Sequence, residues 1–512
     1  MTTASADVLI LGAGSAGCVL ANRLSADPAR RVVVLEAGGR VTDPDMRRPE
    51  LWPFIQHRDY DWDYLTVPQR GLAGRQLSWA RGRGVGGSSL LHATAHMRGC
   101  RADYDRWVAA TGDERWSWDR LLPRFRAMES FSGGADAVHG ADGPMPVLLP
   151  GPDLVNPLVQ DFLAGAESLG VRRIPDHNGG EMLGATPNSL KLRNGERVTD
   201  ADAYLDPVLD RPNLAVLTGV TVHRLRISGG RVLGAEVVVD GESMFVAADT
   251  VILAAGSIAD PLLLMRSGVG DPEVLGAAGV ETVLESPQVG KNLHDHLLGA
   301  GNLYRAARPV PPTRLNLSES MSYQSAKGLG ETAGPVDVVV GCVVAPSASE
   351  SFDPGVGLGE GFTLLFGVTN PTSRGELRIT GPSIEDAPVI DPNYLDTEHD
   401  RAMFRLALER ARLIGASEAL AGWRAEEVLP GPRVRTEADI DAFIARAAIT
   451  HHHPVGTLRM GADDAAPVTP RLAFRGLEGL YVVDGSVIPS ITAGPVHAPV
   501  LAIAEEFAAG FD

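Results

Sequence analysis

Apolar and polar positions follow two different periods along this chain, and the first forty residues carry the clearest pattern. The stretch from Asp7 to Gly12 is apolar between its ends, and a second apolar run, Val32–Leu35, leads into Glu36. Short apolar runs without alternation are typical of strands that a parallel sheet buries on both faces. Between the two runs, Cys18–Leu24 has helical periodicity. The order strand, glycine turn, helix and strand predicts a βαβ unit.

The rest of the chain predicts a mixture of strands and helices, without internal repeats. The stretch from about 150 to 190 contains several clusters of turn-forming Gly, Pro and Asn. In chain order, the further predictions are antiparallel strands in Arg231–Val251, a buried strand in Val251–Gly256, a strand at Val338–Val344, a helix at Met403–Leu420, a strand at Leu480–Asp484 and a helix from about Ala498 to Ala509. Because the α/β pattern returns at the end, both ends of the chain are expected in one domain, with a second domain inserted between them.

Length and charge restrict the classes of protein. The 512 residues exceed one ordinary domain. Hydrophobic residues form 44% and charged residues 21% of the chain, the proportions of a globular protein. The 46 basic residues face 64 acidic ones, so the net charge is -18. Because an acidic surface repels nucleic-acid phosphates, we expect no nucleic-acid partner.

Cysteine use and hydropathy bear on location. Cys18, Cys100 and Cys342 lie far apart and form no CxxC pair, so neither a disulfide framework nor a zinc site is expected. No apolar run approaches the ~18 residues of a membrane helix. The stretch from Met1 to Asp7 lacks the Lys or Arg of a signal peptide. We therefore expect a cytoplasmic protein without membrane insertion.

Lysine is nearly absent from the chain. Lys191, Lys291 and Lys327 are the three lysines among the 46 basic residues. None has a recognisable setting, so the sequence does not indicate Schiff-base chemistry.

The glycine turn after the first strand has the spacing GxGxxG. Gly12 permits the tight turn, Gly14 lets the backbone approach a pyrophosphate, and Gly17 lets the helix pack on the strand. The helix N-terminus adds free N–H groups and a partial positive charge. Glu36 follows Gly17 at the distance expected of a carboxylate that binds a ribose. This segment predicts a dinucleotide site and leaves NAD and FAD open.

The C-terminal segment favours FAD. Asp484 and Gly485 follow a predicted strand, at the edge where α/β sheets bind ligands. A second acid at the nucleotide site suits an extended ligand whose ribityl chain needs its own partners. Ala498 and Pro499 begin a predicted helix, whose dipole could stabilise negative charge on a reduced flavin ring.

A series of ordered motifs then identifies a family. These motifs are Gly12–Gly17 with Glu36–Gly38, Arg81–Ser89, Met97–Gly99, Asp103–Trp107, Ala254–Gly256, Ser267–Gly270, Val289–His296, His453–Gly461, Asp484–Pro489 and His497–Pro499. With them, the chain resembles the glucose–methanol–choline (GMC) family of FAD-dependent oxidoreductases over essentially its whole length.

The resemblance implies an α/β fold (α+β overall), with a Rossmann-like FAD-binding domain and a substrate domain built on an antiparallel sheet flanked by helices. The FAD-binding domain would be discontinuous and comprise residues 1–150, 190–300 and 450–512. The substrate-binding domain would comprise residues 151–189 and 301–449. By resemblance, the residues expected to hold FAD without a covalent bond are Gly12, Gly14, Ser15, Ala16, Glu36, Gly86, His92, Val222, Asp484, Gly485, Ala498 and Pro499.

One of these residues departs from the family pattern. His92 stands where the family usually has Asn, beside the flavin. The imidazole could alter the polarity around the ring. Covalent attachment is not expected, because the histidines that carry flavin in the family do not align with His92.

The catalytic candidates are histidines. An alcohol loses hydride only when its hydroxyl proton is also removed, and imidazole has a suitable pKa. His453 and His497 match the family's positions for the catalytic pair. If the triplet that ends in His453 is extended, His451 shares its face and His452 points away, so His451 and His453 could both line the pocket. His452 is then expected to satisfy local hydrogen bonds, and histidines without a placed carboxylate do not indicate a metal site.

The residues around these histidines indicate a class of substrate. At His92–Gly99, at the triplet and at Pro495, the chain resembles the family members that oxidise a primary alcohol on an aromatic or heteroaromatic ring, pyridoxine-like or benzylic. His451, His453 and Pro495 would surround the hydroxymethyl group; His453 would take the proton, flavin N5 the hydride, and O2 would reoxidise the flavin to give H2O2. Two alternatives stay open: a choline-type or aliphatic alcohol dehydrogenase with a quinone or protein electron acceptor, and an FAD-containing hydroxynitrile lyase.

Overall fold

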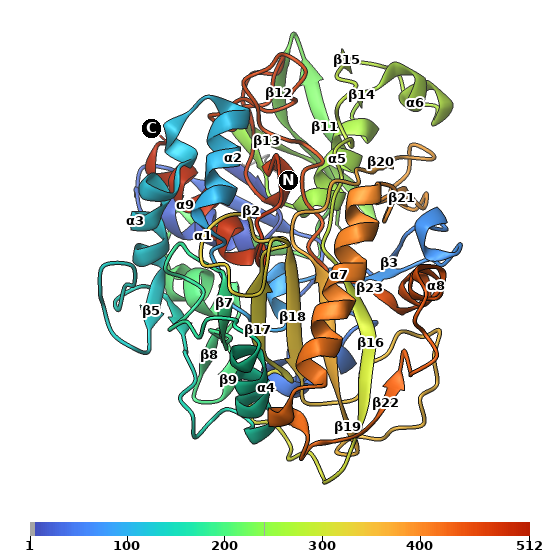
Figure 1. Ribbon diagram of the computed structural model, residues 1–512. Helices are drawn as coiled ribbons and strands as arrows, with labels where there is room; N and C mark the ends of the chain where they lie inside the picture. Colours follow the sequence, from blue (N-terminus) through green and yellow to red (C-terminus); the bar gives the residue numbers. More distant parts are fainter. Residues whose placement is uncertain (1–5, 240, 512) are drawn as a thin grey trace.

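The computed structural model describes residues 6–239 and 241–511 (Figure 1). Residues 1–5, 240 and 512 lie outside the described residues, and with them most of the stretch from Met1 to Asp7 on which the signal-peptide argument rests. Two large sheets, one mainly parallel and one antiparallel, organise the described chain.

The parallel sheet collects strands from both ends and the middle of the chain. Its strand order is β10–β2–β1–β13–β24, and every neighbouring pair is parallel. All five residues of β2 are buried, as expected of an apolar run without alternation. The bounds are β1 Ala6–Leu11, β2 Val32–Glu36, β10 Leu214–Thr218, β13 Glu242–Leu253 and β24 Leu480–Val482. Because the strands are parallel, the turns that follow β1, β2, β13 and β24 meet at one edge of the sheet.

Strand β13 pairs with three strands: with β1 and β24 in parallel, and with β12 antiparallel. Its residues 248–253 pair with β1, whereas residues 242–247 pair antiparallel with β12 (Arg231–Val239), which pairs with β11 (Thr221–Ser228). The antiparallel strands predicted before residue 251 are confirmed. The buried strand predicted at 251–256 is the end of β13, and helix α5 begins at Gly256.

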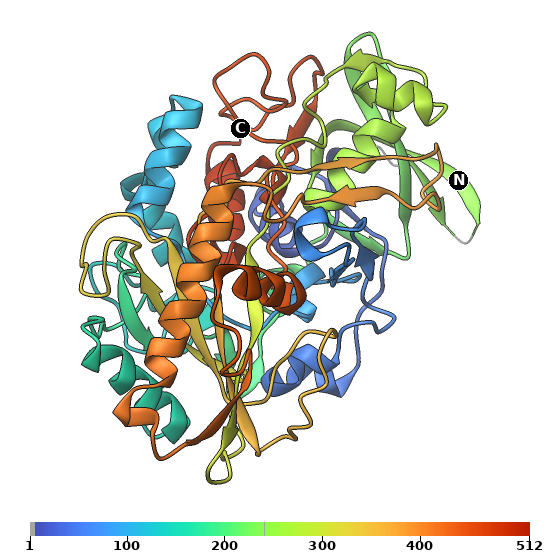
Figure 2. The same ribbon diagram turned by 45° about the vertical axis from the view of Figure 1, so that its right-hand side comes forward.

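The antiparallel sheet forms the other half of the molecule. Its order is β17–β18–β19–β16–β22, and β23 also pairs with β16. Helix α7 (Glu398–Gly415) packs across β18 and β19, and α8 (Glu437–Ala447) lies against α7 (Figure 2). The bounds are β16 Leu297–Ala306, β17 Ser318–Gln324, β18 Val338–Val343, β19 Gly361–Val368, β22 Arg424–Leu429 and β23 Ala448–Thr450. The α/β fold class with an antiparallel sheet flanked by helices is confirmed.

Further helices and short strands cover these sheets. Helices α1 and α9 pack against each other beside the parallel sheet. The helices are α1 (Ser15–Leu24), α2 (Arg101–Thr111), α3 (Trp118–Met128), α4 (Pro157–Ser168), α5 (Gly256–Arg266), α6 (Pro272–Ala277) and α9 (His497–Ala509). The short strands are β3 (Tyr64–Leu65), β4 (Ser78–Trp79), β5 (Glu129–Phe131), β6 (Met145–Val147), β7 (Gly184–Pro187), β8 (Leu192–Arg193), β9 (Glu196–Arg197), β14 (Val269–Gly270), β15 (Leu284–Glu285), β20 (Glu376–Arg378) and β21 (Val389–Asp391).

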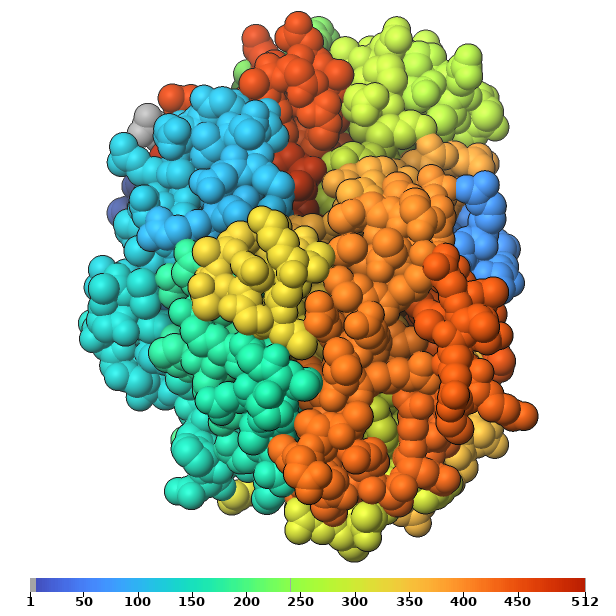
Figure 3. Space-filling view, in the orientation of Figure 1, coloured from blue at the N-terminus to red at the C-terminus, as the bar shows by residue number. Residues whose placement is uncertain are grey.

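Helix α4 lies in a stretch where the sequence indicated mainly turns. The Asn156 side chain caps it by accepting from the Leu158 N–H, and Pro157 occupies its first position. The helix packs against α7 and β17, and Figure 3 shows the surfaces of α4 and α7 side by side. Among the described residues, no helix is both long and apolar enough to cross a membrane.

Candidate active site

A large cavity connects the parallel sheet with the antiparallel sheet. Its volume is about 900 Å³, near the upper end of the ~300–1,000 Å³ typical of ligand pockets. One end is lined by the residues that follow β1 and β2, and the other by side chains of the antiparallel sheet and by the histidine triplet. The cavity therefore offers room for an extended ligand that reaches from the glycine turn to the histidines.

The glycine turn is built for close backbone contact. A Cβ atom on Gly12 would lie 2.7 Å from the Ala254 carbonyl oxygen, and one on Gly17 would lie 1.9 Å from the Gly12 carbonyl oxygen. Gly14 differs, because its Cβ would meet no atom nearer than 3.7 Å. Helix α1 starts after Gly14 without a side-chain cap, so its first N–H groups are available to a phosphate. The turn fits the pyrophosphate of a dinucleotide.

Glu36 ties the end of β2 to this turn. Its Oε2 accepts from the Ala13 N–H and its Oε1 from the Gly38 N–H, both at 2.9 Å. Burial raises the pKa of the carboxyl group above its ordinary value, although these hydrogen bonds oppose the shift. Glu36 also lines the cavity, where the sequence predicts a partner for a ribose.

Asp484 connects two segments at the same edge of the sheet through hydrogen bonds. Its Oδ2 accepts from the Gly256 N–H at 2.6 Å, and its Oδ1 accepts from the Ser486 N–H at 2.8 Å and the Ser486 hydroxyl at 2.6 Å. The side chain thereby joins the start of α5 to the turn after β24, while still lining the cavity.

Most of the predicted site residues meet at this cavity, but not all. Gly86, Ala498 and Pro499 do not line it. The Gly86 N–H donates to the Ala13 carbonyl at 2.8 Å, and Ala498 and Pro499 are buried in the first turn of α9, so these three support the wall. The thirteen that line it are Gly12, Gly14, Ser15, Ala16, Glu36, His92, Val222, His451, His453, Asp484, Gly485, Pro495 and His497.

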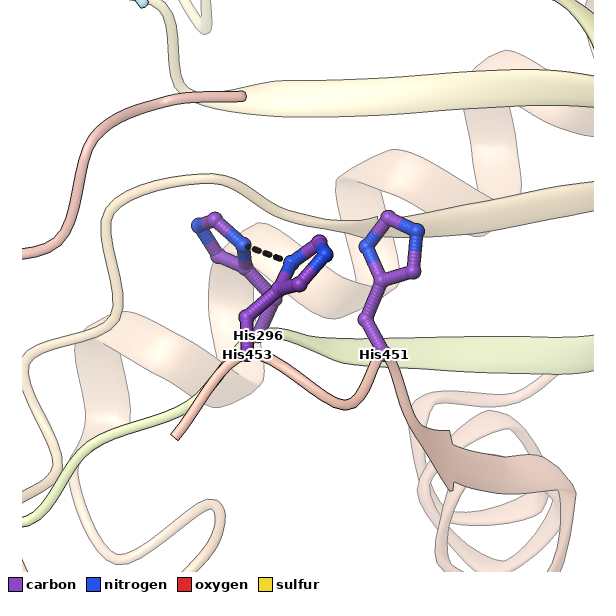
Figure 4. A group of neighbouring side chains, drawn as sticks. All are labelled: His296, His451 and His453. Atoms are coloured by element: carbon purple, nitrogen blue, oxygen red, sulfur yellow. Dashed lines mark hydrogen bonds between the residues drawn. The ribbon is translucent and has the colours of Figure 1, made fainter. Parts of the chain in front are cut away.

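His453 is paired with a second histidine. The Nδ1 atoms of His453 and His296 lie 2.9 Å apart (Figure 4), and His296 Nε2 lies 2.9 Å from the Thr369 carbonyl oxygen. A carbonyl only accepts, so His296 Nε2 carries a proton and, in the neutral ring, its Nδ1 is an acceptor. His453 must then donate from Nδ1. Its Nε2 consequently keeps a lone pair, as a general base requires.

The backbone of this segment is held by Asp295. Asp295 Oδ1 accepts from the His453 N–H at 2.6 Å, and Oδ2 accepts from the hydroxyls of Thr450, at 2.6 Å, and Tyr394. Burial raises the pKa of Asp295 to about 6, although these hydrogen bonds oppose the shift. The carboxyl group fixes the position of His453 without contacting its ring.

The register between β16 and β23 brings the histidines together. Leu297 pairs with Thr450, so His296 lies opposite His451, whose N–H donates to the His296 carbonyl at 2.9 Å. The chain then turns through a left-handed residue, His452, with φ 62°. The rings of His451 and His453 lie with their centroids 4.2 Å apart and project to the same side (Figure 4). The two share a face as predicted, through this left-handed turn and not through an extended chain.

The three imidazoles form a neutral cluster. Burial lowers the pKa of His453 and His451 well below the ordinary histidine value, and the neighbouring imidazoles reinforce the shift. Burial also lowers the pKa of His296 to about 4. Ligand nitrogens of all three lie within 4.8 Å of one another. His296 already uses both of its ring nitrogens in hydrogen bonds, so in this arrangement it has no free nitrogen for a metal ion. The hydrogen-bonded cluster is arranged for proton transfer instead.

His497 is in a different situation from His453. Its Nε2 lies 2.7 Å from Asp200 Oδ2 and its Nδ1 lies 2.9 Å from Lys191 Nζ. Both ring nitrogens are therefore occupied by partners, which disfavours His497 as the group that accepts a substrate proton. The sequence predicts it as a member of the catalytic pair; in the structure it lines the cavity with both ring nitrogens hydrogen-bonded.

His92 lies beside His497, with ring centroids 5.0 Å apart in an edge-to-face arrangement. Its Nδ1 accepts from Arg197 Nη1 at 2.8 Å, so the proton of the neutral ring is on Nε2. Burial lowers the pKa of His92 well below its ordinary value, and Lys191 contributes in the same direction. The wall at this point thus presents a neutral imidazole to the cavity, with the Arg197 guanidinium behind it.

Sequence reasoning missed four residues of the site. His296 and Asp295 were recognised only as part of a family motif, and the signal that could have singled them out is their position directly before an apolar strand. Lys191 and Asp200 gave no signal, because neither belongs to a recognisable local pattern.

The fold and the site define a flavin-type oxidoreductase architecture, and comparison with protein families agrees. Residues 6–298 and 371–504 match the two family models described as GMC oxidoreductase. Together these ranges cover well over half of the chain. The chain belongs to the GMC oxidoreductase family, as the sequence motifs indicated.

Individual relatives are similar over nearly the whole length. The chain is 54% identical to pyridoxine 4-oxidase of Microbacterium luteolum, with 99% of each chain covered. It is 36% identical to human mitochondrial choline dehydrogenase, with 98% of this chain and 88% of the relative covered. Among solved structures, pyridoxine 4-oxidase from Mesorbium loti superposes with a TM-score of 0.97 at 52% identity, with 99% of each chain covered.

The residues present fit the FAD of this family. The uncapped N-terminus of α1 and the open space at Gly14 suit its pyrophosphate, and the cavity continues to His453. FAD as the cofactor agrees with the family to which the chain belongs.

Proposed function

We propose that this protein is an FAD-dependent alcohol oxidase that converts a primary alcohol on an aromatic or heteroaromatic ring, of the pyridoxine or benzylic type, into the aldehyde. The observation that carries the proposal is the neutral ring of His453, whose Nδ1–H is directed to His296 and whose Nε2 keeps its lone pair. The identity of 54% to a pyridoxine 4-oxidase supports the same substrate class.

The substrate end of the cavity suits a flat, apolar ring. Leu298, Met321, Val343 and Leu365 line it, one from each of four neighbouring strands of the antiparallel sheet. Apolar side chains bury an aromatic ring favourably, and a methionine adapts to its shape. These contacts would orient the ring, so that its hydroxymethyl group reaches the histidines.

His453 then removes the hydroxyl proton at Nε2, while His296 stabilises the resulting imidazolium by accepting from Nδ1. His451 provides a second neutral imidazole at the reacting group, and Pro495 closes the cavity wall near it. FAD held at the glycine turn would supply the hydride acceptor, with O2 as the final electron acceptor, so that alcohol and O2 would become aldehyde and H2O2. We propose His453 as the base, His451 as its neighbour at the substrate, and His497 as a residue of the wall.

Two further proposals concern organisation and location. We propose an FAD-binding domain of residues 1–150, 190–300 and 450–512 and a substrate-binding domain of residues 151–189 and 301–449, supported by the separate parallel and antiparallel sheets. We also propose a cytoplasmic location, supported by three cysteines that are buried and unpaired.

An anaerobic mixing experiment tests the proposed function. Purified protein is mixed without oxygen with pyridoxine, with benzyl alcohol and with choline, and the flavin absorbance is followed before air is admitted. We expect bleaching by the two ring alcohols and rapid recovery in air. His453→Ala should slow the bleaching by about 10²–10⁴-fold, whereas the exposed His399→Ala should behave like the wild type.

Each other outcome favours a different function. Bleaching followed by slow recovery in air indicates a dehydrogenase with another electron acceptor. Bleaching by choline alone indicates a choline-type enzyme. Bound flavin that no alcohol bleaches contradicts oxidation and favours a lyase, in which FAD has a structural role.

A further inference from the structure

Lys191 differs from the other two lysines of the chain. Its side chain is 0% exposed, whereas Lys327 is exposed and Lys291 forms a partly exposed ion pair with Glu376. The Lys191 ammonium donates to the Ala95 carbonyl at 2.8 Å and to His497 Nδ1 at 2.9 Å. A buried ammonium is unfavourable unless it is paired and hydrogen-bonded, so these contacts define a built environment for a charge.

The chain of contacts continues to a carboxylate. Because Lys191 donates to His497 Nδ1, the proton of the neutral His497 ring is on Nε2, which donates to Asp200 Oδ2 at 2.7 Å. Although burial alone would raise the pKa of Asp200, His497 and Lys191 keep it below its ordinary value. The result is a buried row of ammonium, neutral imidazole and carboxylate.

This row stands directly behind the cavity wall. Ala95 and His497, the two groups that Lys191 contacts, both line the cavity, and Pro495 and His92 line it next to them. Lys191 and Asp200 do not line it. A ligand in the cavity would therefore meet the neutral His497 ring, with the Lys191 ammonium one hydrogen bond behind its Nδ1 and the Asp200 carboxylate one hydrogen bond behind its Nε2. Because this region is buried and its dielectric constant is low, the charge of Lys191 acts more strongly on a ligand in the cavity than it would in water.

We propose that Lys191 is a positioning residue for the cofactor: it holds His497 in one tautomer and orientation, and its charge favours the reduced form of bound FAD over the oxidised form. The proposal rests on the proposed function only in that the cavity binds FAD. It assigns a role to the row of Lys191, His497 and Asp200 that is distinct from proton removal by His453.

The charge of Lys191 is adjustable near neutral pH. Burial lowers its pKa to about 7, Arg197 acts in the same direction, and Asp200 opposes both. The other titratable groups that face it are His92, His96 and His497, whose pKa values burial lowers, and Arg197, whose pKa burial lowers to about 9. Lys191 is thus the group of this set whose pKa lies near neutral pH.

The test measures the reduction potential of the bound flavin with a reference dye and a chemical reductant, so that no alcohol is needed. The variants are Lys191→Met, Asp200→Asn and, as the matched control, the exposed Lys327→Met. We expect Lys191→Met to make two-electron reduction about tenfold less favourable, a shift of about -30 mV. The difference from the wild type should shrink as the pH rises above 7, where the wild-type lysine loses its charge. Asp200→Asn should shift the potential the other way, and Lys327→Met should leave it unchanged.

The outcomes separate an electrostatic role from a structural one. If Lys191→Met binds FAD with the wild-type potential at every pH, the proposal is wrong and the lysine has only a structural role. If Lys191→Met does not fold, Asp200→Asn decides: an upward shift supports the proposal, and an unchanged potential overturns it. Failure of every alcohol to bleach the flavin would contradict the proposed function and leave this test intact.

Discussion

The Nδ1 atoms of His296 and His453 face each other at 2.9 Å, and only one of them can donate. The Thr369 carbonyl determines which Nδ1 donates, because it requires the proton of the His296 ring on Nε2. His453 therefore presents an unprotonated Nε2. This relationship between two residues 157 positions apart leaves His453 with the lone pair that the proposed base requires.

Replacing His453 should remove the base. We expect His453→Ala to lower the rate of flavin reduction by the alcohol by about 10²–10⁴-fold, the usual contribution of general base catalysis. Anaerobic stopped-flow absorbance measures this rate, with His399→Ala as the control on an exposed histidine. A rate within twofold of the wild type would exclude His453 as the base.

Replacing His296 should act through His453. His296→Phe keeps a ring of similar size but removes the acceptor, so His453 loses the partner that fixes its tautomer. We expect flavin reduction to slow by about 10- to 100-fold, as for other groups that orient a functional histidine. FAD content should remain normal. Equal losses of FAD content and rate would instead indicate a general structural defect.

The glycine turn offers a test of the FAD site. A Cβ on Gly17 would lie 1.9 Å from the Gly12 carbonyl oxygen, whereas a Cβ on Gly39 would meet nothing within 4 Å. Gly17→Ala should therefore distort the turn and yield protein that has lost most of its FAD. Gly39→Ala should retain it. The ratio of flavin to protein absorbance measures both, and full FAD occupancy in Gly17→Ala would contradict this view of the turn.

Acid should destabilise the folded protein. Burial lowers the pKa of His296, His96 and His177 to about 4. Unfolded histidines titrate near 6.5, so between about pH 6.5 and pH 4 the unfolded chain binds protons that the folded chain does not, and the free energy of unfolding falls. His139 acts outside this window: although burial lowers its pKa, the neighbouring carboxylates raise it to about 9, so the stability it adds is fully present below about pH 6.5 and is lost as the pH rises from there toward 9. Asp295 opposes the trend within the window, because burial raises its pKa to about 6.

Thermal unfolding followed by circular dichroism at several pH values checks this expectation. The midpoint should fall steadily as the pH drops through the window from about 6.5 to about 4. His296→Phe, which lacks one of the lowered groups, should lose less stability than the wild type over the same range. A midpoint that rises as the pH falls through this window would contradict the expectation and show that carboxyl groups with raised pKa, such as Asp295, outweigh the buried neutral histidines.

The local elements were largely readable from the sequence. The runs that became β1 and β2, the helix α1 between them, and β18, β24 and α9 all lie close to their predicted positions. Apolar periodicity and glycine spacing reflect local backbone geometry and burial, which neighbouring residues determine. Family motifs extended this to the cofactor and to His453. Helix α4 was missed because turn-forming residues surround its apolar face.

What the tertiary structure decided is which groups meet. His296 lies opposite His451 because β16 pairs with β23 in one particular register, and no local pattern encodes that register. The fold also brings Lys191 and Asp200, both about 300 residues away in the sequence, to the two ring nitrogens of His497. The sequence by itself determined part of the elements, the family and the cofactor. Proton positions and buried charges depend on long-range contacts, and those exist only in the folded chain.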